Sequence, residues 1–209
     1  MSWLLVLAAA VVGLSERPAA LVGAGGQQAY AEWLAAEAFR LDGRNSEEAC
    51  AEPGEARSDW PVIEAPAVFA AEPGFAVEGE PPILHERVSV SGCGRTRVVN
   101  LLAWRLKAGG WRAFGLLPGV TLSDAKLQND ATRVALAAAS AGTTCPAERT
   151  LRFGQARVSV PRTDGGAWTE VWPIALCGQD RTVEVTFTPA ATSGATDFRV
   201  RPIWTAAGG

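Results

Sequence analysis

The sequence predicts an α+β protein made of two related halves, each a helix packed on a small antiparallel sheet and stapled by one disulfide. Three observations predict this fold class: an internal repeat, a helical pattern ahead of each copy, and four widely spaced cysteines. The 209 residues are 48% hydrophobic and 20% charged, which suffices for one compact domain or two small ones.

The chain begins with an apolar run from Trp3 to Leu14, which is too short to span a bilayer and is typical of a secretory signal peptide. Small residues allow cleavage after Ser15 or after Ala24, so we expect a signal peptide within 1–24 and no membrane span after its removal. A buried N-terminal helix is the alternative. The expected location of the protein is the periplasm or the medium.

The internal repeat is found by offsetting the chain by 84 residues, which aligns 86–118 with 170–202 without a gap. About two identities are expected in such a window by chance, and eight occur. They are Glu86/Glu170, Cys93/Cys177, Gly94/Gly178, Arg97/Arg181, Val99/Val183, Gly110/Gly194, Phe114/Phe198 and Pro118/Pro202. We therefore place a first α+β half at 26–119 and a second at 120–209.

A helical pattern precedes each copy. Residues 27–41 are rich in helix formers with apolar residues at three- and four-residue spacings, and Gly43 can end that helix. Residues 121–142 offer Thr121 or Ser123 as a cap and end at Gly142.

Each copy then predicts a meander of at least three strands around its Cys-Gly corner, because alternating residues follow the corner and glycines mark the next turn. The segment 97–106 is apolar on both faces, so its strand should lie more centrally than its counterpart in the second half. Residues 151–160 predict a strand upstream of the second corner, with Leu151, Phe153, Val158 and Val160 as core candidates.

The Pro- and Glu-rich segment 51–84 contains two A-E-P-G copies, at 51–54 and 71–74, which predict turns around a short strand. This segment is a candidate for a loop specific to function, and a variable surface connection is the alternative.

The cysteines are Cys50, Cys93, Cys145 and Cys177, and no C-x-x-C pair occurs, which argues against a zinc ribbon or a redox pair. An even number behind an export signal predicts two disulfides. Three connectivities are open, and the simplest pairs within halves: Cys50 with Cys93, and Cys145 with Cys177.

Catalytic chemistry finds little support in the residue types. His85 is the only histidine, and no nucleophile motif or metal-ligand cluster accompanies it, so we predict no catalytic residue, no metal and no cofactor. The formal net charge of −3 and pI near 5.3 argue against nucleic acid as a partner.

The repeated glutamates Glu86 and Glu170 are the one carboxylate pair that the duplication could bring into related positions. Facing a shared cleft, they could hydrolyse a glycosidic bond. The alternative is that each satisfies a backbone group or pairs with an arginine such as Arg97 or Arg181, and so holds the Cys-Gly corner.

Trp168 and Trp172 share a face of an ideal strand and could bind a sugar or a protein, although filling the core is the alternative. Pro173 interrupts this strand and predicts a sheet edge or a bulge, where a partner strand could add.

The stretch W-T-E-x-W-x-x-x-x-C-G, followed by F-T-P-x-x-x-S-G-A-T-D-F and preceded by L-Q-N-D-A, resembles a group of uncharacterised exported proteins of Gram-negative bacteria. The resemblance covers 121–202. It implies a location outside the cytoplasm, disulfides and no assigned activity.

From these observations we expect an exported, non-enzymatic binding or structural module of the cell envelope, with an unknown envelope protein or polymer as partner. Its candidate binding residues are Trp168, Glu170, Trp172, Glu86, Arg97 and Arg181. The alternative function is a carboxylate-dependent glycan hydrolase that uses Glu86 and Glu170.

Overall fold

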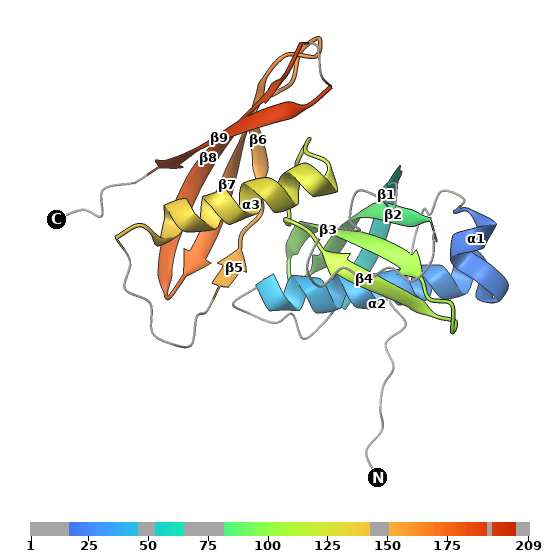
Figure 1. Ribbon diagram of the computed structural model, residues 1–209. Helices are drawn as coiled ribbons and strands as arrows, with labels where there is room; N and C mark the ends of the chain where they lie inside the picture. The colour runs from blue at the N-terminus through green and yellow to red at the C-terminus, as the bar shows by residue number, and fades with distance from the viewer. Residues whose placement is uncertain (1–16, 46–52, 65–81, 143–150, 192–193, 204–209) are drawn as a thin grey trace. The chain divides into compact units, whose positions relative to one another are not determined.

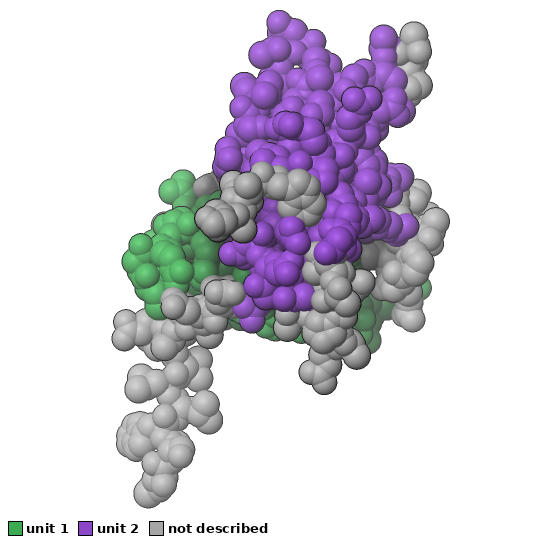
Figure 2. Space-filling model, turned by 90° about the vertical axis from the view of Figure 1, so that its left-hand side faces the viewer, with its two compact units in different colours: residues 1–115 green, residues 116–209 purple. Residues whose placement is uncertain are grey.

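The computed structural model describes residues 17–45, 53–64, 82–142, 151–191 and 194–203. The chain divides into two compact units, Met1–Gly115 and Leu116–Gly209 (Figure 2). Both units contain a helix and an antiparallel sheet, so the predicted α+β class is confirmed. The division lies at the end of a strand, slightly before the limit at 119 taken from the sequence.

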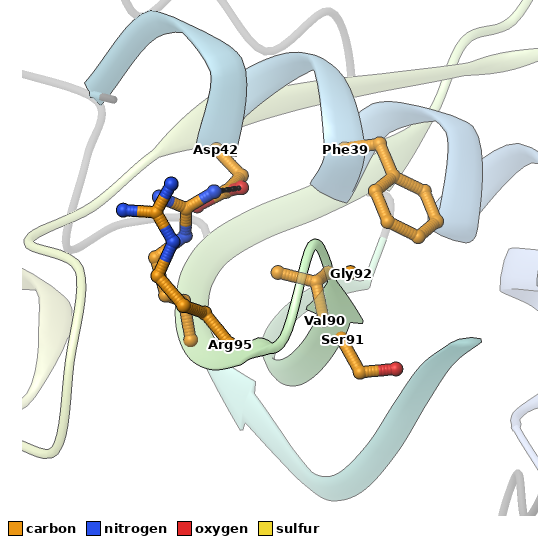
Figure 3. Close-up of a pocket in the computed structure, with 7 residues that line it drawn as sticks. Phe39, Asp42, Val90, Ser91, Gly92 and Arg95 are labelled. Atoms are coloured by element: carbon orange, nitrogen blue, oxygen red, sulfur yellow. Dashed lines mark hydrogen bonds and ion pairs between the residues drawn. The ribbon is translucent and has the colours of Figure 1, made fainter. Parts of the chain in front are cut away.

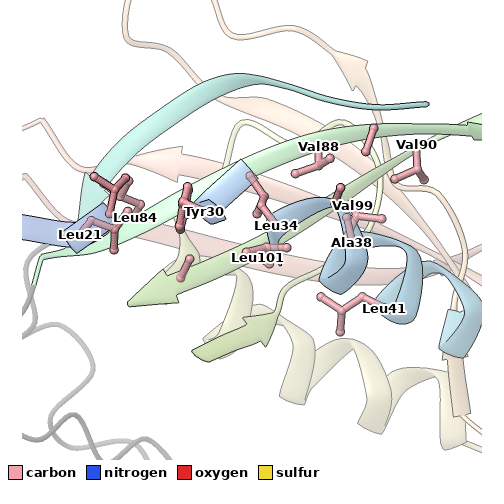
Figure 4. Close-up of a cluster of buried hydrophobic side chains, with 14 residues drawn as sticks. Leu21, Tyr30, Leu34, Ala38, Leu41, Leu84, Val88, Val90, Val99 and Leu101 are labelled. Carbon is pink, nitrogen blue, oxygen red and sulfur yellow. The ribbon is translucent and has the colours of Figure 1, made fainter. Parts of the chain in front are cut away.

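The first unit packs a long helix against one face of a four-stranded antiparallel sheet (Figure 1). The strands follow one another in the order β1-β2-β3-β4. Side chains of the helix, of β2 and of β3 form one hydrophobic cluster (Figure 4). The elements are α1 (Ala19–Val22), the short 3-10 helix η1 (Gly23–Gly25), α2 (Gly26–Asn45), β1 (Pro53–Glu64), β2 (Ile83–Gly92), β3 (Arg95–Arg105) and β4 (Trp111–Gly115).

The second unit packs one helix against a five-stranded sheet in the order β5-β7-β8-β9, in which β6 also pairs with β7. Small helix residues allow the helix to approach the sheet closely, because Ala131, Ala135 and Ala139 all lie in the core. The elements are α3 (Ala125–Ser140), β5 (Leu151–Phe153), β6 (Arg157–Val160), β7 (Trp168–Leu176), β8 (Gln179–Pro189) and β9 (Thr196–Ile203).

Both predicted helices form, but their ends differ from the prediction. Helix α2 continues past Gly43 to Asn45. Helix α3 is capped by neither Thr121 nor Ser123, because Asp124 is the N-cap residue and its side chain accepts a hydrogen bond from the Leu127 N–H at 2.8 Å.

The β2-β3 and β7-β8 hairpins have the same strand register at an offset of 84 residues. Each closes with a two-residue Cys-Gly turn whose central residues both have positive φ, as type I′ turns require. The φ values are 49° and 69° at Cys93 and Gly94, and 55° and 73° at Cys177 and Gly178. Matching pairs are Glu86 opposite Leu101 and Gly92 opposite Arg95 in the first hairpin, and Glu170 opposite Val185 and Leu176 opposite Gln179 in the second.

The gap-free alignment is wrong beyond these hairpins. Ala103 lies opposite Ala113 in the first unit, whereas Phe187 lies opposite Phe198 in the second, so the last strands are out of step by one residue. The predicted equivalence of Phe114 and Phe198 therefore fails: Phe198 packs on the core, while Phe114 is 43% exposed. The cause is a longer connection between β8 and β9 than between β3 and β4.

The apolar strand of the first half is buried on both faces, but it is no more central in its sheet than its counterpart, because β3 and β8 each pair with one strand on either side. Consecutive residues from Val99 to Trp104 are buried in β3, whereas burial alternates along β8 at Val183, Val185 and Phe187.

The predicted single strand at 151–160 is instead two short strands, β5 and β6, separated at 154–156. Both pair with β7, and Pro173 of β7 lies opposite this break, where its carbonyl accepts a hydrogen bond from the Gly154 N–H at 2.9 Å. Because strands pair on both sides of β7, the predicted sheet edge at Pro173 is wrong. The alternative of a bulge fits the pairing, because the register shifts by one residue across the break: Phe153 lies opposite Ile174, whereas Arg157 lies opposite Val171. Leu151 and Val160, taken as core candidates, are exposed.

Several predicted features lie outside the described residues: the apolar run, the A-E-P-G copy at 71–74, Cys50 and Cys145. Of the copy at 51–54, Pro53 and Gly54 lie within strand β1 and not in the predicted turn. None of the helices in the described parts of the chain combines the length and the apolar character that crossing a membrane requires.

Candidate functional site

The repeated glutamates are the centres of two buried polar clusters, one in each unit. Glu86 lies in β2 and Glu170 in β7, and both side chains point to the helix-covered face of their sheet, between apolar neighbours of the core. Each glutamate is fully buried, with an exposure of 0%. A buried carboxylate is costly unless hydrogen-bond donors surround it, so the partners of each define what it can do.

Glu86 is held by a cation. The guanidinium of Arg17 donates from Nε to Oε1 and from Nη2 to Oε2, both at 2.7 Å, and both side chains have no exposed surface. Ser58 of β1 donates to Oε2 at 2.6 Å and Tyr30 of α2 donates to Oε1 at 3.1 Å. The cluster therefore joins the segment before α1, helix α2 and two strands.

Tyr30 is the contact between this cluster and an aromatic group. Its ring lies 5.5 Å from that of Trp33 and 5.6 Å from that of Trp111. Burial, and then the negative charge of Glu86, raise the pKa of the Tyr30 hydroxyl far above its usual value of 10.0, so this hydroxyl remains a hydrogen-bond donor.

Glu170 is held by neutral donors. The Thr121 hydroxyl lies 2.9 and 2.8 Å from the two carboxylate oxygens, and the Leu122 N–H and the Ser123 hydroxyl donate to Oε1. The indole N–H of Trp168 donates to Oε1 at 3.0 Å, and that of Trp172 donates to Oε2 at 2.9 Å. Five donors from two segments thus surround one carboxylate.

A short backbone bridge positions the segment that carries Thr121 and Ser123 beside Glu170. Gly119 forms a parallel bridge with Ala156, whose N–H donates to the Pro118 carbonyl and whose carbonyl accepts from Val120, both at 2.8 Å. A Cβ at Gly119, where φ is 103°, would meet the Ala156 backbone at 2.2 Å, so glycine is required there. The bridge occupies the break between β5 and β6.

Glutamines early in the two helices hold the entry segments in similar ways. Gln27 accepts from the Arg17 N–H and donates to its carbonyl at 2.6 Å. Gln128 accepts from the Leu117 N–H and donates to the Ser123 carbonyl at 2.8 Å. In each unit, therefore, the helix fixes the segment that supplies donors to the buried glutamate.

The predicted arginine partners of the glutamates are wrong. Arg97 donates to Asp42 of α2 at 2.6 Å, and Arg181 donates to Gln179 in its own hairpin. The cation of Glu86 is Arg17, which lies just after the apolar run and was not anticipated. The alternative that a glutamate satisfies a backbone group holds for Glu170, which accepts from the Leu122 N–H.

The candidate binding tryptophans are core residues. Trp168 is 2% exposed and Trp172 is 0% exposed, and the Trp168 ring stacks on Phe187 with centroids 4.9 Å apart. Their indole N–H groups are used by Glu170. Neither side chain can stack on a sugar, so the interpretation as core residues is the correct one.

The other candidate for catalysis, His85, is also buried. His85 is 5% exposed, and no group of three or more potential metal-ligating side chains is found in that part of the chain. One hollow lies beside the Cys93 hairpin and the end of α2, and its lining includes Arg95 and the Asp42–Arg97 ion pair (Figure 3).

The sequence alone did not assign the side chains of Arg17, Ser58, Thr121 and Ser123 to the glutamates. Position could have indicated all of these except Ser58, since they lie in the short segment before a helix whose unit contains a buried glutamate. No family model, curated protein or solved structure matches this chain.

Proposed function

We propose that this chain is an exported, non-enzymatic binding or structural module of the bacterial cell envelope. The observation that carries the proposal is the enclosure of Glu86 and Glu170, each with no exposed surface and each surrounded by donors of its own unit. A glycosidase needs two carboxyl groups that reach the scissile bond. Both candidate carboxylates are therefore part of the structural framework, which argues against the hydrolase alternative.

We further propose that the two units descend from one duplicated element. The identical register of the β2-β3 and β7-β8 hairpins supports this, as does the equivalent position of the two buried glutamates. The slip of one residue in the last strands is what an insertion after duplication produces.

The disulfides Cys50–Cys93 and Cys145–Cys177 belong to the same proposal. Cys93 and Cys177 occupy the same position of matching turns, and neither is a free thiol. A bridge in each half would restrict the unfolded chain, which typically contributes about 3 kcal/mol. A peptide map without reductant tests the pairing, and a peptide that links Cys93 to Cys177 would contradict it.

The face of the second sheet opposite α3 is our candidate partner surface. Pairing across β6, β7, β8 and β9 places Arg157, Val171, Glu184 and Arg201 in one row of this face, and Arg199 lies in the next row. Arg157 and Arg199 are exposed. Arginine side chains bind carboxylate and phosphate groups through paired N–H donors, so we propose an acidic envelope protein or polymer as partner.

Capture from a bacterial envelope extract, with the full chain immobilised, tests this surface. The partner should be retained by the wild type and lost by the double variant Arg157→Glu/Arg199→Glu. The matched control is Arg44→Glu/Arg112→Glu, which makes the same charge change at exposed residues of the first unit. Retention that is equal for all three proteins, or no enrichment at all, would contradict the proposal.

A further inference from the structure

The segment that follows the apolar run is a built part of the first unit. Arg17 is the cation of Glu86, and its side chain is completely enclosed. Its Nη2 also donates to the Ser58 hydroxyl at 3.0 Å, and its backbone is bound on both sides by Gln27. The polar centre of this unit therefore depends on a residue close to the N-terminus.

Apolar contacts extend this attachment along α1. Leu21 and Val22 belong to the same hydrophobic cluster as Leu84 and Leu101, and Leu21 is fully buried (Figure 4). The Leu21 carbonyl accepts a hydrogen bond from the Trp111 indole at 2.9 Å. The burial of these residues is as complete as that of the central strands.

The glycines of η1 are fitted to their surroundings as well. Gly23 has φ of 62°, and a Cβ at this position would meet the Arg105 guanidinium carbon at 2.2 Å. The side chain of Arg105 in β3 thus lies directly against the backbone of Gly23. The positive φ, which residues with a Cβ rarely adopt, accounts for the glycine at this position.

These contacts distinguish the two cleavage positions that the sequence allows. A cut after Ala24 would remove Arg17, Leu21, Val22 and Gly23 together, and it would leave Glu86 buried without its cation. An uncompensated buried charge strongly destabilises a fold. A cut after Ser15 removes none of these side chains.

We propose that an envelope signal peptidase cleaves this chain between Ser15 and Glu16. Water is consumed, the peptide bond is hydrolysed, Ser15 receives the new carboxylate and Glu16 the new α-amino group. Gly13 and Ser15 supply small residues at the two positions before the bond that such peptidases read. This inference rests on the proposed export of the chain.

The test is the intact mass of the full chain, expressed in a Gram-negative host with a C-terminal tag and purified from separate periplasmic and cytoplasmic fractions. A periplasmic product that begins at Glu16 is the expected result. A periplasmic product that begins at Gly25, or one with all residues from Met1, overturns the cleavage position but leaves export in place. Full-length chain that is confined to the cytoplasm overturns both proposals.

A pair of variants identifies the bond independently of folding. Ser15→Trp should abolish the processed product, because a large residue replaces the small one next to the bond. Ala24→Trp is the matched control: Ala24 is exposed, so the fold tolerates the change, and the product should still begin at Glu16. Unchanged processing of Ser15→Trp, or loss of processing in Ala24→Trp, would overturn the inference.

Discussion

The two units place a fully buried glutamate at the same position of the same hairpin, yet they surround it with different chemistry. Glu86 is neutralised by Arg17, whereas the described residues that bind Glu170 are hydroxyl, indole and backbone donors and include no cation. What the two share is connectivity: in both, the glutamate ties a central strand to the segment that leads into the helix. The common feature is therefore the connection between strand and entry segment, and not a particular partner of the glutamate.

The ion pair at Glu86 and the neutral cluster at Glu170 differ in their desolvation penalty. An ion pair requires that both charges leave water, and its attraction offsets that penalty only when the geometry is good, as in the bidentate contact of Arg17. The neutral cluster removes only one charge from water, but it requires every donor to be in place. Removing one partner should therefore be most damaging where that partner is the sole counter-ion.

The largest expected effect follows from Arg17→Leu, which leaves Glu86 buried with Ser58 and Tyr30 as its remaining donors among the described residues. We expect the free energy of unfolding to fall by about 3–5 kcal/mol, because a buried charge loses its partner. Urea denaturation of the protein that begins at Glu16 measures this.

The control for that prediction is the double variant Arg17→Leu/Glu86→Leu. It removes both charges, and apolar replacement of a buried ion pair is often neutral. At least half of the lost stability should return. A double variant that is less stable than Arg17→Leu would show that the pair contributes more than mutual neutralisation.

The next effect is that of Glu170→Gln, which keeps the shape of the side chain but replaces one acceptor oxygen with a donor that faces other donors. We expect a loss of about 2–3 kcal/mol, since bonds to a charged acceptor are lost and a buried polar group is left without a partner.

Glu184→Gln is the matched control for that change, because its carboxylate pairs with Arg201 on the exposed face of the same sheet. An exposed ion pair contributes at most about 1 kcal/mol. Equal losses in the two variants would contradict the buried role of Glu170.

A third prediction uses pH. The pKa of Tyr30 is raised in the folded state, so folding is unaffected below the unfolded pKa of 10.0 and loses stability above it, when only the unfolded chain ionises. The expected slope is about 1.4 kcal/mol per pH unit above pH 10. Because Tyr30 is the only tyrosine, phenolate absorbance should appear only together with unfolding.

Tyr30→Phe is the variant that isolates this contribution. It should be less stable at neutral pH, because Glu86 loses a donor, but its stability should decline less steeply above pH 10. Phenolate absorbance of the wild type at pH 11 in a folded protein would contradict the buried hydroxyl.

The hairpins were predictable from sequence because their constraints are local. A Cys-Gly pair between alternating strands specifies a two-residue turn, and the repeat exposes the same register twice. The partners of Glu86 and Glu170 were not predictable in this way, because Arg17 is 69 residues from Glu86 and Thr121 is 49 residues from Glu170. Nothing in local propensity connects positions so far apart.

Thr121 shows how a correct local rule can mislead. A threonine ahead of a helix is a good cap, and so is Ser123, yet both hydroxyls are drawn to the buried carboxylate and Asp124 caps the helix. A hydroxyl that donates to a buried carboxylate makes a charge-assisted hydrogen bond, which is stronger than the neutral bond that an N-cap hydroxyl accepts from a backbone N–H at an exposed helix end. The contacts with Glu170 therefore determine which residue caps α3, a choice that the local sequence does not specify.

The smallest expected effects distinguish hydrogen bonding to Glu170 from capping of helix α3. Thr121→Val keeps the shape and removes the donor to Glu170, and Asp124→Ala removes the cap; each should lower stability by about 1 kcal/mol. Combined with Glu170→Gln, the Thr121 change should be clearly non-additive because the two groups share one hydrogen bond, whereas the Asp124 change should add within about 0.5 kcal/mol. Urea denaturation of the three single variants and of the two double variants that contain Glu170→Gln measures both cycles. Coupling at Asp124 as strong as at Thr121 would mean that the cap and the buried tie form one cluster, and the contrast between the two units would then have to include the helix end.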